Sequence, residues 1–179
     1  MRFQETSLPG VWVIELERLG DERGWFARTF DEQEFRARGL NPAIVQCNAS
    51  HNARRGTLRG MHYQAGPHAE SKLVRCVRGA VFDVALDLRP DSPTYCAWHG
   101  LELSADNGLC LYVPEGLAHG FQTLTDDTEL LYQMGHRYVP DAVSAVRWDD
   151  PTFAIQWPRE PPEGRIISQR DRTHPDFQP

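Results

Sequence analysis

The sequence lacks the features that mark membrane, secreted and nucleic-acid-binding proteins. No apolar run approaches the roughly 18–20 residues that a membrane-spanning helix needs, and residues 1–7 lack the apolar stretch of a signal peptide. Positive charge is in the minority, because 19 Lys and Arg stand against 25 Asp and Glu and give a net charge of −6. A nucleic-acid-binding surface has the opposite sign. We therefore expect a cytoplasmic protein that binds neither nucleic acid nor membranes.

Cysteine is also scarce and scattered. The four cysteines are separated by 29, 20 and 14 residues, so no close pair has the spacing of a zinc site or a redox dithiol. Free cysteine behaves as a small apolar side chain and is often buried. We expect reduced core residues at Cys47, Cys76, Cys96 and Cys110.

The sequence has instead many short apolar stretches separated by turn residues, which include 14 Gly and 13 Pro. This pattern predicts an all-β protein, and the length favours one domain, residues 1–179. In the stretch 80–87, apolar Phe82, Val84 and Leu86 alternate with positions that include Asp83 and Asp87, so a strand there has one purely apolar face. The predicted strands are 11–16, 44–50, 57–63, 72–78, 80–87, 97–103, 109–113, 120–123, 129–133 and 136–138.

Both ends of the chain depart from this strand pattern. Residues 31–38 predict a short peripheral helix, in which Asp31 caps the first turn, Glu34 completes a capping box and Gly39 supplies the left-handed stop. Proline is frequent after position 151, so residues 152–179 are expected to form an extended coil over the surface. The predicted strand 11–16 has no obvious hairpin partner and could add to the sheet edge of a second copy.

Two stretches have the spacing of the two cupin motifs. Residues 108–119 read G-x5-P-x-G-x2-H and end at His119, and residues 56–62 read G-x5-H and end at His62. In cupins, a jelly-roll barrel presents histidines and a glutamate from such stretches to one metal ion. The resemblance therefore implies a cupin jelly-roll barrel.

Departures from the motif argue against a metal. Gln64 stands where the second histidine of the first motif is expected, and Lys72 stands where the glutamate ligand is expected. A cationic side chain at a ligand position repels a divalent cation, and only His62 and His119 remain of four ligands. We expect no metal and no other cofactor.

The wider residues resemble the dTDP-4-dehydrorhamnose 3,5-epimerase family, whose members are metal-free cupins. The resemblance extends from about residue 7 to residue 175 and implies an epimerase of nucleotide-linked 4-keto-6-deoxy sugars, active as a homodimer. The stretches that carry it are Asp21-x-Arg23-Gly24-x-Phe26, Gln46-x-Asn48-x-Ser50, Arg59 to Gln64, Lys72, residues 114–121, Tyr132, Tyr138-x-Pro140, Trp148-x-Asp150-Pro151 and Ser168-x-x-Asp171.

The residues themselves suit enolisation next to a ketone, which needs a base, a group that stabilises the enolate and, for inversion, an acid on the opposite face. His62 suits the base because imidazole titrates near neutrality. Lys72, assisted by Arg59, can stabilise the enolate oxygen. Tyr132, on a different predicted strand from His62, can return a proton. The resemblance implies the same acid, and it implies that Asp171 is the carboxylate that orients His62.

The substrate-binding residues follow mainly from the resemblance. Arginine can bind phosphate oxygens with two parallel hydrogen bonds, and aromatic side chains can stack on a base. Five further histidines, at positions 51, 68, 99, 136 and 174, are expected at the surface. The predicted contacts are Arg23, Phe26, Gln46, Asn48, Arg59, His119, Tyr138 and Arg170.

Three alternatives remain open at this point: an epimerase of one carbon or of another nucleotide sugar, a metal-dependent cupin, and a sugar-binding cupin without catalysis. Arg28 and Val143 stand where the family usually has acidic residues near the nucleotide. Such changes of charge can alter which nucleotide sugar is accepted without changing the enolising centre.

Overall fold

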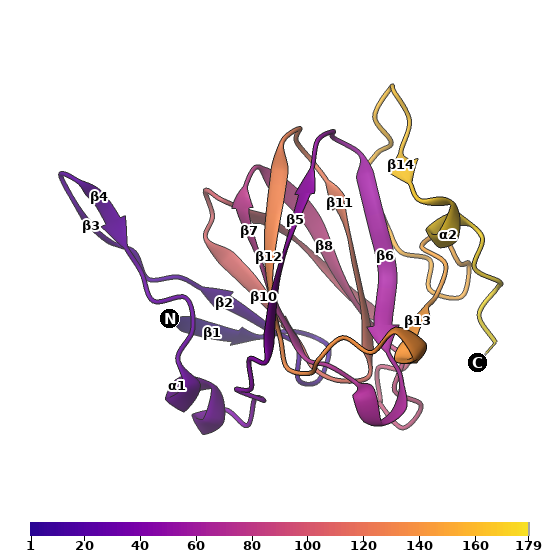
Figure 1. Ribbon diagram of the computed structural model, residues 1–179, viewed down its shortest axis with the longest axis horizontal. Helices are drawn as coiled ribbons and strands as arrows, with labels where there is room; N and C mark the ends of the chain where they lie inside the picture. The colour runs from indigo at the N-terminus through magenta and orange to yellow at the C-terminus, as the bar shows by residue number, and fades with distance from the viewer. Residues whose placement is uncertain (179) are drawn as a thin grey trace.

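The computed structural model describes residues 1–178, in which two six-stranded sheets face each other as a jelly roll (Figure 1). The all-β prediction is confirmed. The first sheet contains, in spatial order, β1 (Arg2–Glu5), β2 (Trp12–Glu15), β10 (Leu109–Val113), β7 (Lys72–Arg78), β12 (Thr128–Met134) and β5 (Gln46–Asn52). The second contains β13 (Val143–Ala145), β6 (Thr57–Gln64), β11 (Leu117–Thr123), β8 (Ala80–Asp87) and β9 (Trp98–Ser104), with β14 (Ile166–Ile167) parallel to β6.

Three apolar clusters hold these sheets in place. The largest lies between the sheets and joins Val74 of β7 to Val81 of β8 and Phe121 of β11. A second covers the outer face of the first sheet, and a third, around Met61, covers the outer face of the second sheet. Because burial of apolar area drives folding, both faces of each sheet contribute to stability.

Strand β8 shows the predicted alternation. Val84 and Leu86 pack in the outer cluster, whereas Val81 and Ala85 pack between the sheets. Asp83 shares the inner face and is fully buried. The period of two therefore places one carboxylate in the interior of the barrel.

The N-terminal region corrects one prediction. Strand β2 does have a hairpin partner, because β1 pairs with it antiparallel from Arg2↔Glu15 to Glu5↔Trp12, and β10 pairs on its other side. The idea that strand 11–16 is free to join a second copy was therefore wrong. The signal was missed because β1 is four residues long and mostly polar.

Helix α1 (Glu32–Ala37) packs on the outer face of the first sheet. Asp31 accepts hydrogen bonds from the amides of Gln33 and Glu34 at 3.0 and 3.2 Å, so the predicted cap is present. The Glu34 carboxylate contacts Arg38 at 3.5 Å instead of completing a capping box. Gly39 has the predicted left-handed conformation, with φ of 71°.

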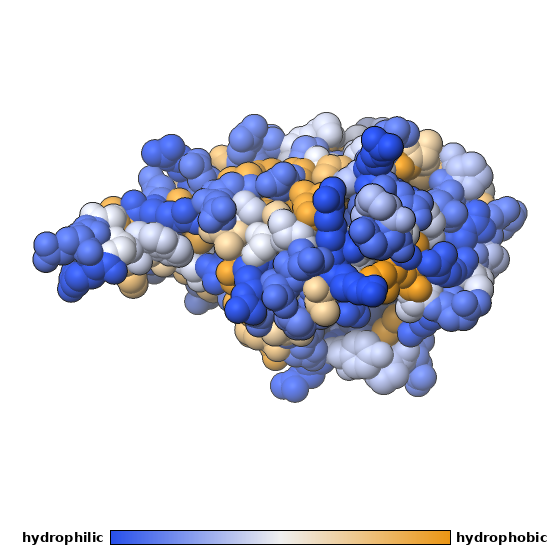
Figure 2. All heavy atoms as spheres, turned by 90° about the horizontal axis from the view of Figure 1, so that it is seen from above, coloured by the Kyte–Doolittle hydropathy of each residue, from blue (hydrophilic) through white to orange (hydrophobic). Residues whose placement is uncertain are grey.

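Between β2 and α1 the chain forms a hairpin that projects from the body, which we call the arm (residues 19–26). It consists of β3 (Leu19–Asp21) and β4 (Gly24–Phe26), and Figure 1 and Figure 2 both show it extending away from the two sheets. Leu19, Trp25 and Phe26 are 71%, 55% and 71% exposed. The arm therefore makes little contact with the rest of its own chain.

The C-terminal segment is more ordered than a coil. It passes the outer side of β6, adds β14 to that strand and then forms α2 (Gln169–Arg172) (Figure 1). Buried Asp150 anchors it by accepting hydrogen bonds from the amides of Phe177 and Thr152 at 2.7 and 2.9 Å.

The predicted strand 136–138 is absent, and two short 3-10 helices, Gly66–His68 and Pro140–Ala142, border one end of the barrel. Among residues 1–178, no helix is long and apolar enough to cross a membrane.

Candidate active site

A cavity of about 260 Å³ opens at one end of the barrel, between β5 and β6 and the segments that follow β12. Five residues predicted from the sequence line it: Gln46, Asn48, His62, Tyr138 and Arg170. Its remaining lining residues are Tyr63, Gln64, Glu70, Met134, His136 and Val143. His136, which the sequence predicted only as a surface residue, thus lies in the lining of this cavity.

His62 and Asp171 form the central polar pair of this cavity. His62 Nε2 lies 2.8 Å from Asp171 Oδ1, and the His62 side chain is 39% exposed whereas Asp171 is buried. Burial by itself raises the pKa of the Asp171 carboxyl, but the hydrogen bond and charge of His62 and the Gly60 amide outweigh it and leave that pKa below its ordinary value. An ionised Asp171 fixes a proton on Nε2, which leaves Nδ1 of a neutral His62 free to accept one.

Helix α2 brings this carboxylate to His62 from 109 residues away. Ser168 caps the start of the helix, and its hydroxyl accepts a hydrogen bond from the Asp171 amide at 3.1 Å. The Gly60 amide lies 3.5 Å from Asp171 Oδ2. The carboxylate is thus held by its own helix and by the strand that carries His62.

A bulge in β6 determines which side chains of this strand face inward. His62 pairs with His119 and Arg59 pairs with Phe121, so three steps along β6 oppose two along β11. The extra residue shifts the alternation, so that Arg59, which bonds to Asn52 of β5, and His62, which lines the cavity, both face the interior although they are three positions apart. Gly60 permits this arrangement, because its φ is 133° and an added Cβ would lie 2.6 Å from the Cα of Gly120.

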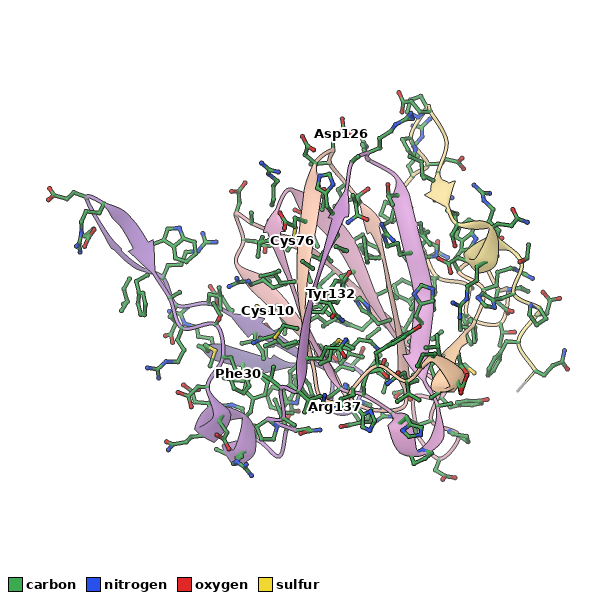
Figure 3. All side chains as sticks on the ribbon, in the orientation of Figure 1. Phe30, Cys76, Cys110, Asp126, Tyr132 and Arg137 are labelled. Atoms are coloured by element: carbon green, nitrogen blue, oxygen red, sulfur yellow. The ribbon has the colours of Figure 1, made fainter. Side chains whose placement is uncertain are left out.

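Tyr132 lies on β12 of the first sheet, opposite the sheet that carries His62, and points into the interior (Figure 3). Its hydroxyl lies 3.1 Å from Ser50 Oγ. Burial raises the pKa of this hydroxyl well above its ordinary value, the charge of Asp83 adds to the effect, and Ser50 and Arg59 oppose it. The hydroxyl therefore stays protonated at neutral pH.

Lys72 is buried at the start of β7, and its Nζ lies 2.5 Å from Glu70 Oε1. Burial lowers the pKa of the ammonium, and the Glu70 carboxylate partly offsets the change. Glu70, not Lys72, is among the residues that line the cavity. The sequence reasoning missed Glu70, although a spacing of two residues along extended chain places both side chains on one face.

His119 occupies the interior rather than the cavity wall. It is 5% exposed, and its Nε2 lies 2.9 Å from Asp83 Oδ1. Its ring stacks edge-on against Tyr132, with 6.1 Å between ring centroids. His119, which was predicted to contact the substrate, is thus buried between Asp83 and Tyr132 and forms a second His–Asp pair.

Two further predicted residues organise the walls of the site. Arg59 donates from Nε to Asn52 Oδ1 at 2.8 Å, and its positive charge acts on Tyr132. Gln64 is buried and bonds to the backbone of both bordering loops: it donates to the carbonyl oxygens of residues 68 and 137 and accepts from the amide of residue 139. The Gln64 side chain therefore fixes the two loops that border the cavity.

Arg23 and Phe26 are not brought to this cavity by their own chain. Both lie on the arm, where Arg23 pairs with Asp21, and no arm residue lines the cavity. Arg28 pairs with Asp31 at 2.8 Å near the base of the arm. Within residues 1–178, no group of three His, Cys, Asp or Glu side chains is placed to hold a metal ion.

Comparison with known proteins gives the family. A model of the family described as dTDP-4-dehydrorhamnose 3,5-epimerase matches residues 5–179. The epimerase of that name from Methanothermobacter thermautotrophicus is 46% identical over 171 residues, which cover 96% of this chain and 91% of the relative.

Solved structures agree with this match. The epimerase from Elizabethkingia anophelis superposes with a TM-score of 0.94 at 39% identity and covers 99% of this chain and 96% of its own. An enzyme from Legionella pneumophila, solved in complex with dTDP-4-keto-L-rhamnose, has a TM-score of 0.89 at 35% identity and covers 95% of this chain and 89% of its own. With the jelly roll and the His62–Asp171 pair in the cavity, these matches show that the chain belongs to the dTDP-4-dehydrorhamnose 3,5-epimerase family.

Proposed function

We propose that this protein inverts carbon 3, carbon 5 or both of a dTDP-linked 4-keto-6-deoxy sugar by enolisation. One observation carries the proposal. A histidine hydrogen-bonded to a buried carboxylate lies at the cavity, and a partly buried, protonated tyrosine lies on the opposite sheet. A base and an acid on opposite sides of the reacting carbon are what inversion through a planar enolate requires, and the two sheets supply one each.

Proton abstraction falls to His62. Its Nδ1 takes the proton from the carbon next to the ketone, the C–H electron pair forms the enolate double bond, and the carbonyl oxygen becomes negative. Asp171, held ionised, stabilises the imidazolium that results. The pair therefore acts as a base whose orientation is fixed by the carboxylate.

The developing oxygen charge needs a positive partner, and Lys72 and Arg59 are the cations assigned to it. Lys72 of β7 pairs with Met134, two residues along β12 from Tyr132, and Arg59 is close enough for its charge to act on the Tyr132 hydroxyl. In a buried site such charges interact with an enolate far more strongly than in water.

Tyr132 then donates its hydroxyl proton to the carbanionic carbon from the face opposite His62. Its raised pKa keeps the proton in place until the strongly basic enolate forms. After donation, Ser50 and the nearby charge of Arg59 stabilise the phenolate. Protonation from this face inverts the configuration of that carbon and completes the step.

The nucleotide part is assigned to the outer cavity and to a second copy of the chain. Gln46, Asn48, Tyr138 and Arg170 line the cavity in the same chain as His62. Arg23 and Phe26 lie on the exposed arm, so their contact with substrate requires a homodimer in which the arm of one copy reaches the cavity of the other. This arrangement also accounts for the exposed apolar side chains of the arm.

Incubation with dTDP-4-keto-6-deoxyglucose in deuterated water, followed by NMR, tests the reaction. We expect deuterium at carbon 3, carbon 5 or both, and inversion at the labelled carbons; the pattern distinguishes single from double epimerisation. His62→Ala should lose about 100- to 10,000-fold in exchange rate. His51→Ala, which changes an exposed histidine of β5, is the matched control. Absence of deuterium with the wild-type protein would contradict the proposal.

The dimer is tested by mixing two inactive variants. In a mixed dimer of His62→Ala and Arg23→Ala chains, one cavity has its own His62 and receives an intact arm from the other copy. We expect activity to return on mixing, and a dimer mass by light scattering. A monomer mass, or no recovery in dimers shown to be mixed, would rule the arrangement out.

A further inference from the structure

The cavity contains a buried carboxylate that the reaction scheme above does not use. Glu70 lines the cavity, and its side chain is only 4% exposed. Its Oε1 contacts Lys72, whereas its Oε2 is buried without a hydrogen-bond partner in the described chain. A buried carboxylate oxygen without a partner is costly, so such atoms in native proteins call for an explanation.

We propose that Glu70 is the acceptor for a hydroxyl group of the substrate's sugar ring, on carbon 2 or carbon 3. The inference deepens the proposed function and rests on it for the identity of the sugar. The observation that carries it is the unpartnered Oε2 of a carboxylate that is more than nine-tenths buried in the cavity wall.

Charge decides which part of a nucleotide sugar Glu70 can accept. A diphosphate carries only acceptor oxygens and negative charge, so a buried carboxylate repels it. A ring hydroxyl can donate, and a hydrogen bond to a charged acceptor is stronger than one between neutral groups. The sugar ring is therefore the part of the substrate that meets Glu70, and the diphosphate lies away from it.

Lys72 makes this acceptor possible. The Lys72 ammonium lies 2.5 Å from Oε1, and its positive charge offsets the cost of burying the negative carboxylate. The ammonium occupies Oε1, and Oε2 remains for the ligand. One ion pair thus supplies both a cation beside the reacting ketone and a fixed acceptor that orients the ring.

The test measures binding, so that it does not depend on turnover. Calorimetry compares dTDP-6-deoxyglucose, which cannot enolise, with its 2-deoxy and 3-deoxy forms. For the wild-type protein we expect one of the two deoxy ligands to bind about tenfold or more weakly than the parent, as loss of a hydrogen bond to a charged group predicts.

Glu70→Gln then tests whether Glu70 is the partner. Its amide oxygen must face the ammonium, so the NH2 group replaces the acceptor on the ligand side. The penalty is the ratio of the dissociation constants of the deoxy ligand and the parent. We expect Glu70→Gln to reduce this ratio by about fivefold, because a neutral hydrogen bond contributes less binding free energy than a charged one. Glu102→Gln, an exposed change of the same kind on β9, should keep the full penalty.

Lys72 also provides a check on the variant, because it is the only lysine among the 179 residues. Protein labelled with 15N-lysine has one side-chain ammonium to observe, and its signal reports whether Lys72 remains buried in Glu70→Gln. If that variant does not fold, Glu70→Asp serves instead, since it keeps the charge and withdraws the carboxylate by one methylene. We expect it to reduce the penalty as well.

The outcomes separate this inference from the proposed function. Equal binding of all three ligands, or a penalty that Glu70→Gln and Glu70→Asp leave unchanged, would overturn the assignment of Glu70 even if deuterium exchange occurs. A penalty that depends on Glu70 supports it even if no exchange is seen, in which case only the epimerase reaction fails. No binding of any ligand would overturn both.

Discussion

Tyr132→Phe separates the two halves of the proposed reaction. The substitution removes one hydroxyl and leaves the ring, His62 and Lys72 in place. Proton loss to His62 and recapture on the same face should continue, while delivery to the opposite face fails. We therefore expect deuterium exchange to remain within a few-fold of wild type, whereas inversion falls by about 100- to 10,000-fold, the usual contribution of a positioned acid.

The structure indicates that this variant will fold. The hydroxyl has one hydrogen-bond partner, Ser50 Oγ at 3.1 Å, and Ser50 keeps a second neighbour in Asn52 Nδ2 at 3.5 Å. Loss of one such bond costs about 0.5–1.5 kcal/mol of unfolding free energy, against a typical total of about 5–15 kcal/mol. A loss of inversion therefore reports chemistry, and thermal unfolding of the variant provides the control.

The assay follows both quantities in one sample. NMR in deuterated water gives the amount of deuterium in recovered substrate and the amount of inverted product, and their ratio is the measured quantity. Full epimerase activity in Tyr132→Phe would refute the assignment of acid and base to opposing sheets. Equal loss of exchange and inversion would show instead that Tyr132 is needed before proton abstraction.

Three other variants test the supporting structure. Asp171→Asn should slow deuterium exchange by about 100- to 10,000-fold, because an amide can turn its NH2 group towards His62 and favour the wrong tautomer; a near-normal rate would contradict this. Gly60→Ala should lower the free energy of unfolding by about 1–3 kcal/mol, because the new Cβ would lie 2.6 Å from the backbone of Gly120. A lower melting temperature would report this loss. Burial would raise the pKa of Asp87, but hydrogen bonds from Arg89, Ser92 and Thr94 outweigh it and lower this pKa. The ionised Asp87 carboxylate therefore stabilises the folded protein above about pH 4, and this contribution is lost as the pH falls further. Asp87→Asn should therefore be less stable at neutral pH and lose less stability in acid, as urea unfolding at several pH values would show.

Local sequence pattern was enough for the parts of the fold that depend on neighbouring residues. The alternation in 80–87 predicts β8 because side chains of a strand point to opposite faces. Asp31 and Gly39 predict the limits of α1 because capping involves residues within one turn. Motif order along the chain likewise gave the family, which requires no coordinates.

Only the tertiary structure decided the contacts that make the site. The family resemblance implied that Asp171 orients His62, but no local pattern predicts this contact, because it spans 109 residues and depends on a four-residue helix too short to have a periodic pattern. The bulge beside Gly60, which turns His62 inward, depends on the neighbouring strand β11. Glu70 acquires its partner and its free oxygen only through burial against the barrel interior. Sequence determines such contacts through the whole fold, because packing between distant segments leaves no periodic signal in either of them.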